Sequence, residues 1–270
     1  MKGARFVGVV LRRKDLRTTF PRRFAARLTG QTVVRLDRRA KYLLAPLSSG
    51  DTLLMHLGMS GSFSVARAAR GDGAAGGSVE AGPSTGRRAG IHDHVAFHMS
   101  SGAIVTFNDP RRFGLMDLLT PRQLTGHPTL SRLGPEPLSA GFDAAALAQA
   151  CRGKKTSLKA ALLDQRVVAG LGNIYVSEAL HVARLSPQRQ ASTIATPSGL
   201  PRPAASRLAA AIKQVLRDAV RGVSKARYRS ERFRVYDRAG KRCTRAHCAG
   251  VIARRTQAGR TTYYCPVCQR

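Results

Sequence analysis

The sequence has 270 residues, which is more than one domain of ordinary size, and its hydrophobic content of 43% is enough to form buried cores and excludes wholesale disorder. It contains 46 Lys and Arg residues against 15 Asp and Glu, a formal net charge of +31, and only nine of the basic residues are Lys. Guanidinium groups match phosphate geometry, so we predict a nucleic acid as the partner. A genome that favours Arg codons would explain the Arg excess, but it would not explain the shortage of acidic residues.

We expect a cytoplasmic protein that has no contact with a membrane. No apolar run approaches the length of a membrane span, and no secretory signal follows Met1.

The first half of the chain predicts an antiparallel β-sandwich or barrel. Short aliphatic and β-branched runs alternate with turn signals such as residues 48–51. Residues 20–28 predict one short helix, and residues 66–90, rich in Gly, Ala, Ser and Arg, predict a flexible insertion between two strands. The predicted strands cover residues 5–11, 32–36, 42–45, 52–57, 94–98 and 103–107.

The second half changes to helical spacing of its apolar residues, so the fold class is α+β. The helices are predicted over residues 143–151, 157–164, 174–183 and 204–220. We divide the chain into a β-domain (1–125), a linker (126–142), a helical domain (143–232) and a C-terminal unit (233–270).

The C-terminal unit holds four of the five cysteines in two close pairs. Residues 251–253 and 261–264 between the pairs can form a hairpin, which would bring four thiolates to one tetrahedral, structural zinc ion. Two disulfides are the alternative, and a cytosolic compartment disfavours them. His247 lies inside the first pair and could replace a cysteine, whereas Cys151 predicts a small core residue. The predicted zinc ligands are Cys243, Cys248, Cys265 and Cys268.

Seven motifs follow one another in a single order along the chain. They are residues 38–44, 56–61, 92–94, 109–114, 133–138 and 172–175, and the terminal cysteines. Together they resemble the bacterial formamidopyrimidine-DNA glycosylases of the endonuclease VIII-like superfamily. The resemblance implies an N-terminal β-sandwich, a helical domain with a helix–two-turn–helix at residues 165–172, and a C-terminal zinc finger, with duplex DNA in the cleft between them.

The resemblance also implies an activity in DNA base-excision repair. Such an enzyme works as a monomer on double-stranded DNA, excises oxidised purines such as 8-oxoguanine or formamidopyrimidine, and nicks the abasic site by β,δ-elimination. We expect it in the bacterial cytoplasm, associated with the nucleoid. The alternatives are a catalytically impaired paralogue that binds damaged DNA without excising the base and, more remotely, an RNA-binding zinc-ribbon protein.

Site residues carry over from the family at matching positions. An extruded base leaves a hole in the duplex, which Met59 and Phe113 would fill as wedges while Arg111 bonds the orphaned base. Either apolar side chain could equally lie in the core, since each follows a strand. Asn173 is expected to cap a helix and contact phosphate. The residues that the resemblance assigns to DNA binding are Met59, His92, Arg111, Phe113, Lys155, Asn173 and Arg260.

Two residues are assigned to catalysis. Lys41 matches a proton donor of the family, and its expected place on a strand beside Arg38 and Arg39 would lower its pKa. Arg260 matches the finger arginine assigned to phosphate contact and elimination, and phosphate clamping suits a guanidinium better than proton donation.

The sequence departs from the family pattern in two functional places. Family members begin Met-Pro-Glu-Leu-Pro-Glu, where the proline amine is the nucleophile and the glutamate the acid/base, but this chain begins Met1-Lys2-Gly3. Either the true start lies upstream, or the chain is a degenerate paralogue in which Lys41 offers weak lyase action. Residues 221–231 are also shorter than the family's lesion-capping loop.

Overall fold

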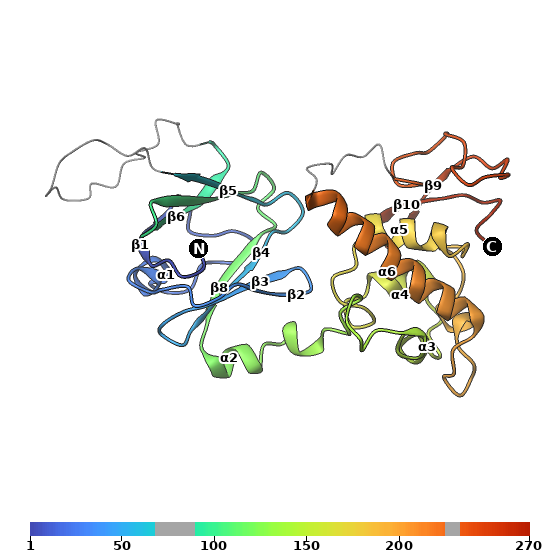
Figure 1. The fold of residues 1–270 in the computed structure, drawn as a ribbon, viewed down its shortest axis with the longest axis horizontal. Helices are drawn as coiled ribbons and strands as arrows, with labels where there is room; N and C mark the ends of the chain where they lie inside the picture. Colours follow the sequence, from blue (N-terminus) through green and yellow to red (C-terminus); the bar gives the residue numbers. More distant parts are fainter. Residues whose placement is uncertain (68–89, 225–232) are drawn as a thin grey trace, which may run out of the picture. The chain divides into compact units, whose positions relative to one another are not determined.

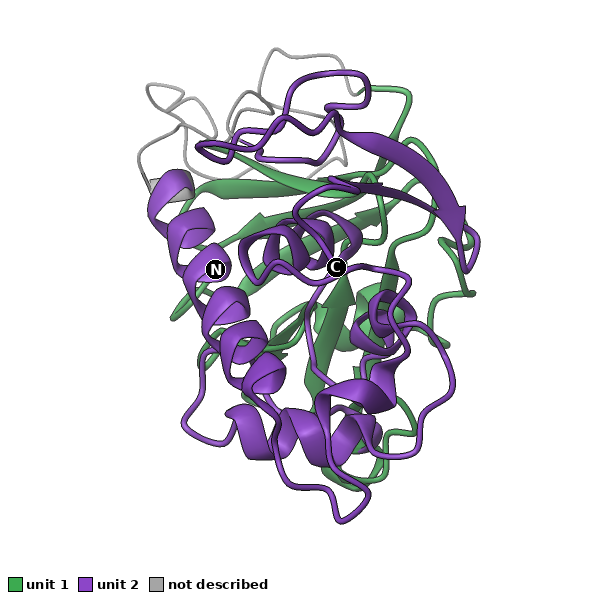
Figure 2. Cartoon of the chain, turned by 90° about the vertical axis from the view of Figure 1, so that its right-hand side faces the viewer, with its two compact units in different colours: residues 1–131 green, residues 132–270 purple. Residues whose placement is uncertain are grey.

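The structure is a computed structural model that describes residues 1–67, 90–224 and 233–270. It divides into two compact units, residues 1–131 and 132–270, and each is described by itself (Figure 2). The division falls inside the predicted linker. In the described ranges, no helix is both long and apolar enough for a membrane span.

Unit 1 is the predicted β-sandwich, made of two four-stranded antiparallel sheets with the strand orders β1-β6-β7-β5 and β2-β3-β4-β8 (Figure 1). Apolar side chains of both sheets, among them Phe6, Phe97, Leu53 and Met116, form one buried core. The strands are β1 (Phe6–Leu11), β2 (Asp37–Arg39), β3 (Tyr42–Pro46), β4 (Thr52–His56), β5 (Ser62–Arg67), β6 (Asp93–Met99), β7 (Ala103–Asn108) and β8 (Leu115–Leu119).

Several predicted elements of unit 1 need correction. Residues 32–36 do not form a strand: Thr32 and Val33 make only isolated bridges, and the second strand begins at Asp37. Strand β5 was not predicted, although Phe63 and Val65 alternate with serines; it lies at a sheet edge and most of its side chains are exposed. It takes in residues 66 and 67 of the predicted insertion, and residues 68–89 lie outside the described part. Helix α1 (Phe24–Leu28) is shorter than predicted, and helix α2 (Pro121–Thr125) was not predicted.

Unit 2 begins with a helical core. The side chains of Asp143 and Ser157 accept backbone N–H groups at the N-termini of α3 and α4, which is why these helices begin where they do. Helix α6 extends past its predicted end and takes in residues 221–224, while residues 225–231 lie outside the described part. The helical elements are η1 (Leu130–Arg132), which spans the division, α3 (Ala144–Cys151), α4 (Leu158–Leu163), α5 (Asn173–Val182), η2 (Ala191–Ile194) and α6 (Pro203–Ser224).

The chain ends in the predicted hairpin, formed by β9 (Ala253–Gln257) and β10 (Arg260–Tyr264). Its first strand begins two residues later than predicted, because Ala253 pairs with Tyr264 and the turn falls on Ala258 and Gly259. A small core of Val235, Ile252 and the cysteines lies beside the hairpin. The predicted α+β class is therefore confirmed, with a sandwich, a helical region and a cysteine-bearing hairpin.

Candidate functional site

Asp109 joins the two loops of unit 1 that carry the predicted wedge residues. Its carboxylate is buried and accepts hydrogen bonds from Ser60 Oγ at 2.6 Å, from the N–H of Gly114 at 2.7 Å and from the N–H of Arg111 at 3.3 Å. His94 Nε2 contacts the carbonyl oxygen of Asp109 at 2.8 Å. Burial alone would raise the pKa of Asp109, but the hydrogen bonds from Ser60 and the backbone outweigh it and hold the pKa below its usual value.

Gly58 lets the two loops approach each other closely. It has a φ of +68°, and a Cβ at this position would lie 2.4 Å from the backbone carbon of Phe113. Only glycine fits both requirements, so the loop after β4 and the loop after β7 run side by side.

The wedge residues lie on the surface, so the core interpretation of Met59 and Phe113 is wrong. Met59 is 66% exposed and Phe113 is 41% exposed, although both are large and apolar. The guanidinium of Arg111 lies 4.8 Å from the centre of the Phe113 ring. Exposed apolar side chains on two loops that a buried carboxylate joins indicate a binding surface.

The structure brings His92 to the same cluster and places Lys41 on a neighbouring turn. The backbone carbonyl of His92 accepts the N–H of Asp109 at 3.0 Å. Lys41 lies in the turn between β2 and β3, and not on a strand as expected. Burial, together with the charges of Lys41 and Arg17, lowers the pKa of His56, so His56 is neutral at neutral pH beside Lys41.

The two turns between α4 and α5 are held by Gln165, which the sequence analysis did not single out. Its amide nitrogen donates to the carbonyls of Leu163 and Leu171 at 3.0 Å, and its amide oxygen accepts the N–H of Gly170 at 2.9 Å. Gly170 has the left-handed φ of 79° that this turn needs. The Gln165 side chain therefore links the end of α4 to the loop before α5.

Asn173 does not cap α5, contrary to the prediction. The cap is Gly172, and the Asn173 amide instead donates to the carbonyl of Thr261 on β10 at 2.9 Å. Arg260, the preceding residue, opens β10 with an exposed side chain. Lys155 is exposed just before α4.

Lys159 is a buried cation that sequence reasoning missed. Its Nζ donates to Thr262 Oγ1 at 2.6 Å and to the Thr261 carbonyl at 3.0 Å. Burial and the charge of Arg260 lower the pKa of Lys159 to about 8. Lys159 and Asn173 thus both bond the carbonyl of Thr261 on β10, one residue after Arg260. Sequence reasoning missed Lys159 because no motif marks a lone Lys on the apolar face of a helix.

The four predicted cysteines form one cluster suited to a metal ion. All four Sγ atoms lie within 4.8 Å of one another. Cys243 and Cys268 are 3.9 Å apart, and Cys248 and Cys265 are 3.7 Å apart, too far for disulfides and close to the sulfur spacing of about 3.8 Å in a tetrahedral zinc site. His247 is not part of the cluster, and burial raises the pKa of Cys151 to about 11, as expected of a core thiol.

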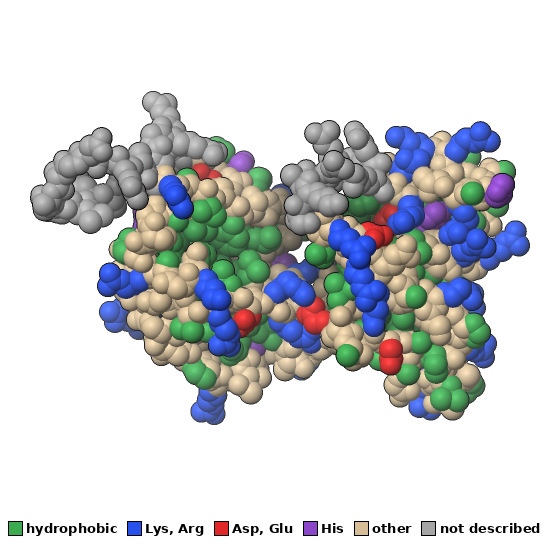
Figure 3. All heavy atoms as spheres, viewed as in Figure 1, with side chains coloured by type: hydrophobic (Ala, Val, Ile, Leu, Met, Phe, Trp, Pro, Cys, Tyr) green, Lys and Arg blue, Asp and Glu red, His purple; other side chains and the backbone are tan. Residues whose placement is uncertain are grey.

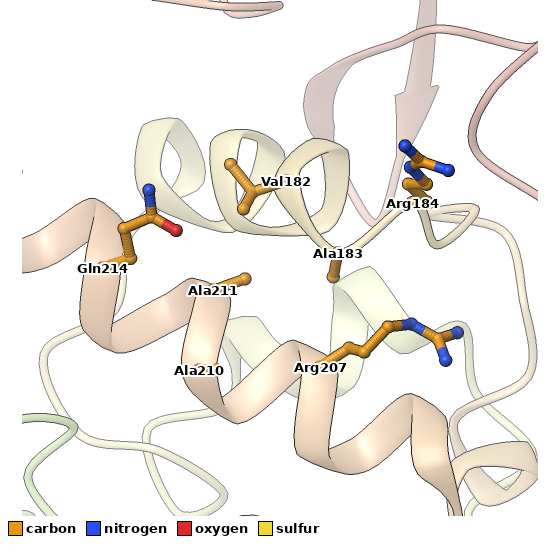
Figure 4. Close-up of a pocket in the computed structure, with 7 residues that line it drawn as sticks. All are labelled: Val182, Ala183, Arg184, Arg207, Ala210, Ala211 and Gln214. Carbon is orange, nitrogen blue, oxygen red and sulfur yellow. The ribbon is translucent and has the colours of Figure 1, made fainter. Parts of the chain in front are cut away.

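The surface is rich in basic side chains and carries an open groove in unit 2 among the described residues. Lys and Arg side chains are spread over the visible face of both units, and few acidic side chains accompany them (Figure 3). An open groove of about 610 Å³ lies between α5 and α6, with Arg184 and Arg207 at one end and Gln214 at the other (Figure 4). None of the residues predicted from the sequence lines this groove.

Comparisons with known proteins agree along the whole chain. The model of the formamidopyrimidine-DNA glycosylase N-terminal domain matches residues 1–116, and the model of the H2TH domain of the same protein matches residues 133–230. Formamidopyrimidine-DNA glycosylase of Rhodopseudomonas palustris (strain BisB18) is 54% identical over 281 aligned residues, covering 100% of this chain and 94% of the relative. That of Bradyrhizobium sp. (strain BTAi1 / ATCC BAA-1182) is also 54% identical with the same coverage.

Solved structures match the fold over the same length. The Lactococcus lactis enzyme bound to DNA with an abasic site has a TM-score of 0.81 at 26% identity, covering 100% of this chain and 94% of the other. Its complex with DNA containing FAPY-dG has a TM-score of 0.82 at 26% identity, covering 99% and 93%. The fold is therefore that of the helix–two-turn–helix DNA glycosylases. Within that class, the chain belongs to the formamidopyrimidine-DNA glycosylase family.

Proposed function

We propose that this protein acts in DNA base-excision repair, excising oxidised purines from double-stranded DNA and nicking the resulting abasic site. The observation that carries the proposal is the exposed group of Met59, Arg111 and Phe113, locked in place by Asp109 in a chain that matches the family from end to end. Exposed apolar side chains cost free energy in the unbound protein, so two joined loops that each present one of them suit insertion into a base stack.

The wedge residues have complementary chemistry. A flexible thioether and an aromatic ring can fill the space left by an extruded base, and a guanidinium can donate hydrogen bonds to the orphaned partner. Arg111 lies over the Phe113 ring, which orients its donors before DNA arrives.

Phosphate contacts are proposed for Lys155, Asn173 and Arg260 in unit 2 and for His92 in unit 1. Arg260 is suited to this role because Lys159 and Asn173 hold the next residue of its strand. A guanidinium on a fixed strand can bind a phosphate through two parallel hydrogen bonds.

The chemical steps need a nucleophilic amine, and the family's Pro-Glu opening is not among the 270 residues. We assign Lys41 to proton transfer near the reacting sugar, as the resemblance implies, and Arg260 to clamping the phosphate during elimination. Lys41 lies beside the neutral His56, so the two groups do not both carry charge at neutral pH.

We infer that the ion held by the four cysteines is a structural zinc. Four thiolates at tetrahedral spacing prefer zinc and leave no open coordination position, so the metal holds the hairpin and takes no part in catalysis. The purified protein should contain one zinc ion per chain, and its removal should unfold the hairpin and weaken DNA binding. An iron–sulfur chromophore, or full DNA binding after metal removal, would contradict this assignment.

The activity is tested with a duplex that carries one 8-oxoguanine. The 270-residue chain is compared with a version extended by Met-Pro-Glu-Leu-Pro-Glu and with a matched extension in which Pro and Glu are replaced by Ala and Gln. We expect the first extension to excise the base and nick the strand about 100-fold or more faster than the Ala/Gln extension, since it supplies the nucleophile and the acid/base. Equal rates on damaged and undamaged duplex for every version would overturn the proposal.

Lyase action by Lys41 is tested separately by borohydride trapping on abasic DNA. A covalent adduct formed by the 270-residue chain and lost in Lys41→Ala would assign imine formation to Lys41. An adduct that survives this substitution would rule it out.

A further inference from the structure

His181 is a buried side chain that neither the sequence motifs nor the proposed function uses. It lies in the last turn of α5 and is only 2% exposed. Its Nε2 atom is 3.3 Å from Sγ of Cys243, one of the four clustered cysteines. This distance is within hydrogen-bonding range for a ring nitrogen and a sulfur atom.

We propose that His181 is an outer-shell residue of the zinc site, whose Nε2–H donates a hydrogen bond to the metal-bound sulfur of Cys243 and slows loss of the metal. This inference rests on the proposed zinc. A cysteine that ligates zinc is a thiolate, which has no proton and can only accept, so the proton of the contact must lie on Nε2.

The surroundings of the ring favour this tautomer. Nδ1 is buried and has no hydrogen-bond partner among the described residues, so no acceptor there competes with the sulfur for the imidazole proton. His181 also lines a polar recess of about 170 Å³ together with Gln214, Thr244 and Arg245.

The backbone around His181 is tied to the C-terminal segment from both directions. Arg245, two residues after Cys243, donates to the carbonyl of His181 at 2.8 Å. One turn earlier, the buried carboxylate of Glu178 accepts the N–H groups of Val235 and Tyr236 at 2.9 Å. The imidazole is therefore presented to Cys243 from a fixed helix and does not need to be ordered when the metal binds.

A hydrogen bond of this kind withdraws charge from the thiolate and opposes its protonation. Outer-shell partners of metal ligands are typically worth about 10–100-fold in metal affinity. Since α5 begins at Asn173, which contacts β10, the same helix would join the hairpin and its metal centre to the helical region.

The experiment uses the purified full chain loaded with zinc. His181→Phe keeps a flat ring but removes the N–H donor, and His181→Gln keeps an N–H near the Nε2 position. His247→Asn is the matched control, because His247 is an exposed finger histidine outside the cysteine cluster and Asn tolerates its left-handed φ of 58°. Zinc release into excess chelator is followed by the colour of a metallochromic dye, and circular dichroism monitors the fold.

We expect His181→Phe to release zinc about 10–100-fold faster than the unchanged protein, with His181→Gln between them and His247→Asn unchanged. In cobalt-substituted protein, the sulfur-to-cobalt charge-transfer band should shift in His181→Phe only. Equal release rates and equal spectra in His181→Phe and the unchanged protein would overturn the proposal. If the protein nevertheless contains one zinc ion per chain, the zinc assignment stands, so the two failures can be told apart.

A measurement on the unchanged sequence decides the matter if His181→Phe does not fold. In protein loaded with cadmium-113, the Nε2 proton of His181 should show scalar coupling to the metal through the N–H···S hydrogen bond. A resolved Nε2 proton without this coupling, or a proton found on Nδ1, would overturn the proposal.

Discussion

Asp109 shows how one buried carboxylate can set the shape of a binding surface. Its two oxygens accept from Ser60 on one loop and from the backbone of Arg111 and Gly114 on the other. An ionised acceptor bonded this way contributes more than a neutral one, and its loss leaves donors unpaired.

We expect Asp109→Asn to lower the free energy of unfolding by about 2–4 kcal/mol, since the new NH₂ group faces an N–H donor. Urea denaturation at neutral pH measures this loss. The rate of 8-oxoguanine excision, measured in the version extended by Met-Pro-Glu-Leu-Pro-Glu, should also fall in Asp109→Asn. Asp15→Asn is the control, because Asp15 pairs with Arg112 of the same loop in an exposed ion pair worth about 1 kcal/mol or less.

The effect of Asp109 should depend on pH with a definite sign. Its folded pKa lies below its unfolded value, so its contribution is complete above about pH 4 and is lost as the pH falls through the folded pKa. The stability difference between the unchanged protein and Asp109→Asn should therefore narrow in acid. A difference that stays constant down to the acid transition would contradict the role given to the carboxylate.

Lys159 makes a second pH-dependent prediction, in the alkaline range. Its pKa is about 8 in the folded protein and about 10.4 in an unfolded chain, so the unfolded state binds more protons between these values. Stability should rise with pH from about 8 to about 10.4, and Lys159→Met should abolish this rise. Guanidinium titrations at several pH values measure it, with Lys155→Met, which removes an exposed Lys nearby, as the control.

At the scale of elements, the wedge depends on how tightly two loops of unit 1 approach. Gly58→Ala adds a methyl group 2.4 Å from the backbone of Phe113 and also strains a left-handed residue. We expect a loss of about 3 kcal/mol or more, with weaker binding of lesion DNA. Gly102→Ala is the matched control, because Gly102 has a similar φ of +76° but open space around its Cβ, so its cost should stay at about 1–2 kcal/mol.

A thermal melt and a DNA titration of the two variants separate backbone strain from loop contact. Equal losses in Gly58→Ala and Gly102→Ala would mean that the close approach of the loops contributes nothing to stability.

Apolar runs and apolar periodicity predicted those elements that bury one or both faces. Strands such as β4 and β7 and the four main helices carry apolar residues at regular spacing, and their bounds agree with the prediction to within a few residues. Strand β2 is mostly exposed and has no apolar residue, so no apolar pattern marked it, and β5 carries only the short alternation of Phe63 and Val65. The hairpin was predicted from cysteine spacing rather than from periodicity.

At the scale of the whole molecule, a net charge of +31 predicts DNA affinity that falls steeply with salt. The logarithm of the binding constant should fall linearly with the logarithm of salt concentration. Arg260→Ala should reduce the slope by about 1, as expected when one phosphate contact is lost. Arg22→Ala, which removes the same charge from an exposed position near α1, should leave the slope nearly unchanged. Identical slopes for both variants would remove Arg260 from the phosphate contacts.

The sequence by itself determined the fold class, the four-cysteine set and the family, because hydrophobic periodicity and short motifs are local properties of the chain. Only the tertiary structure decided that Met59 and Phe113 are exposed, that Lys159 and Asn173 share a carbonyl on β10, and that His181 contacts Cys243. These features depend on residues as far as 102 positions apart, and a contact of that range leaves no periodic pattern in the sequence.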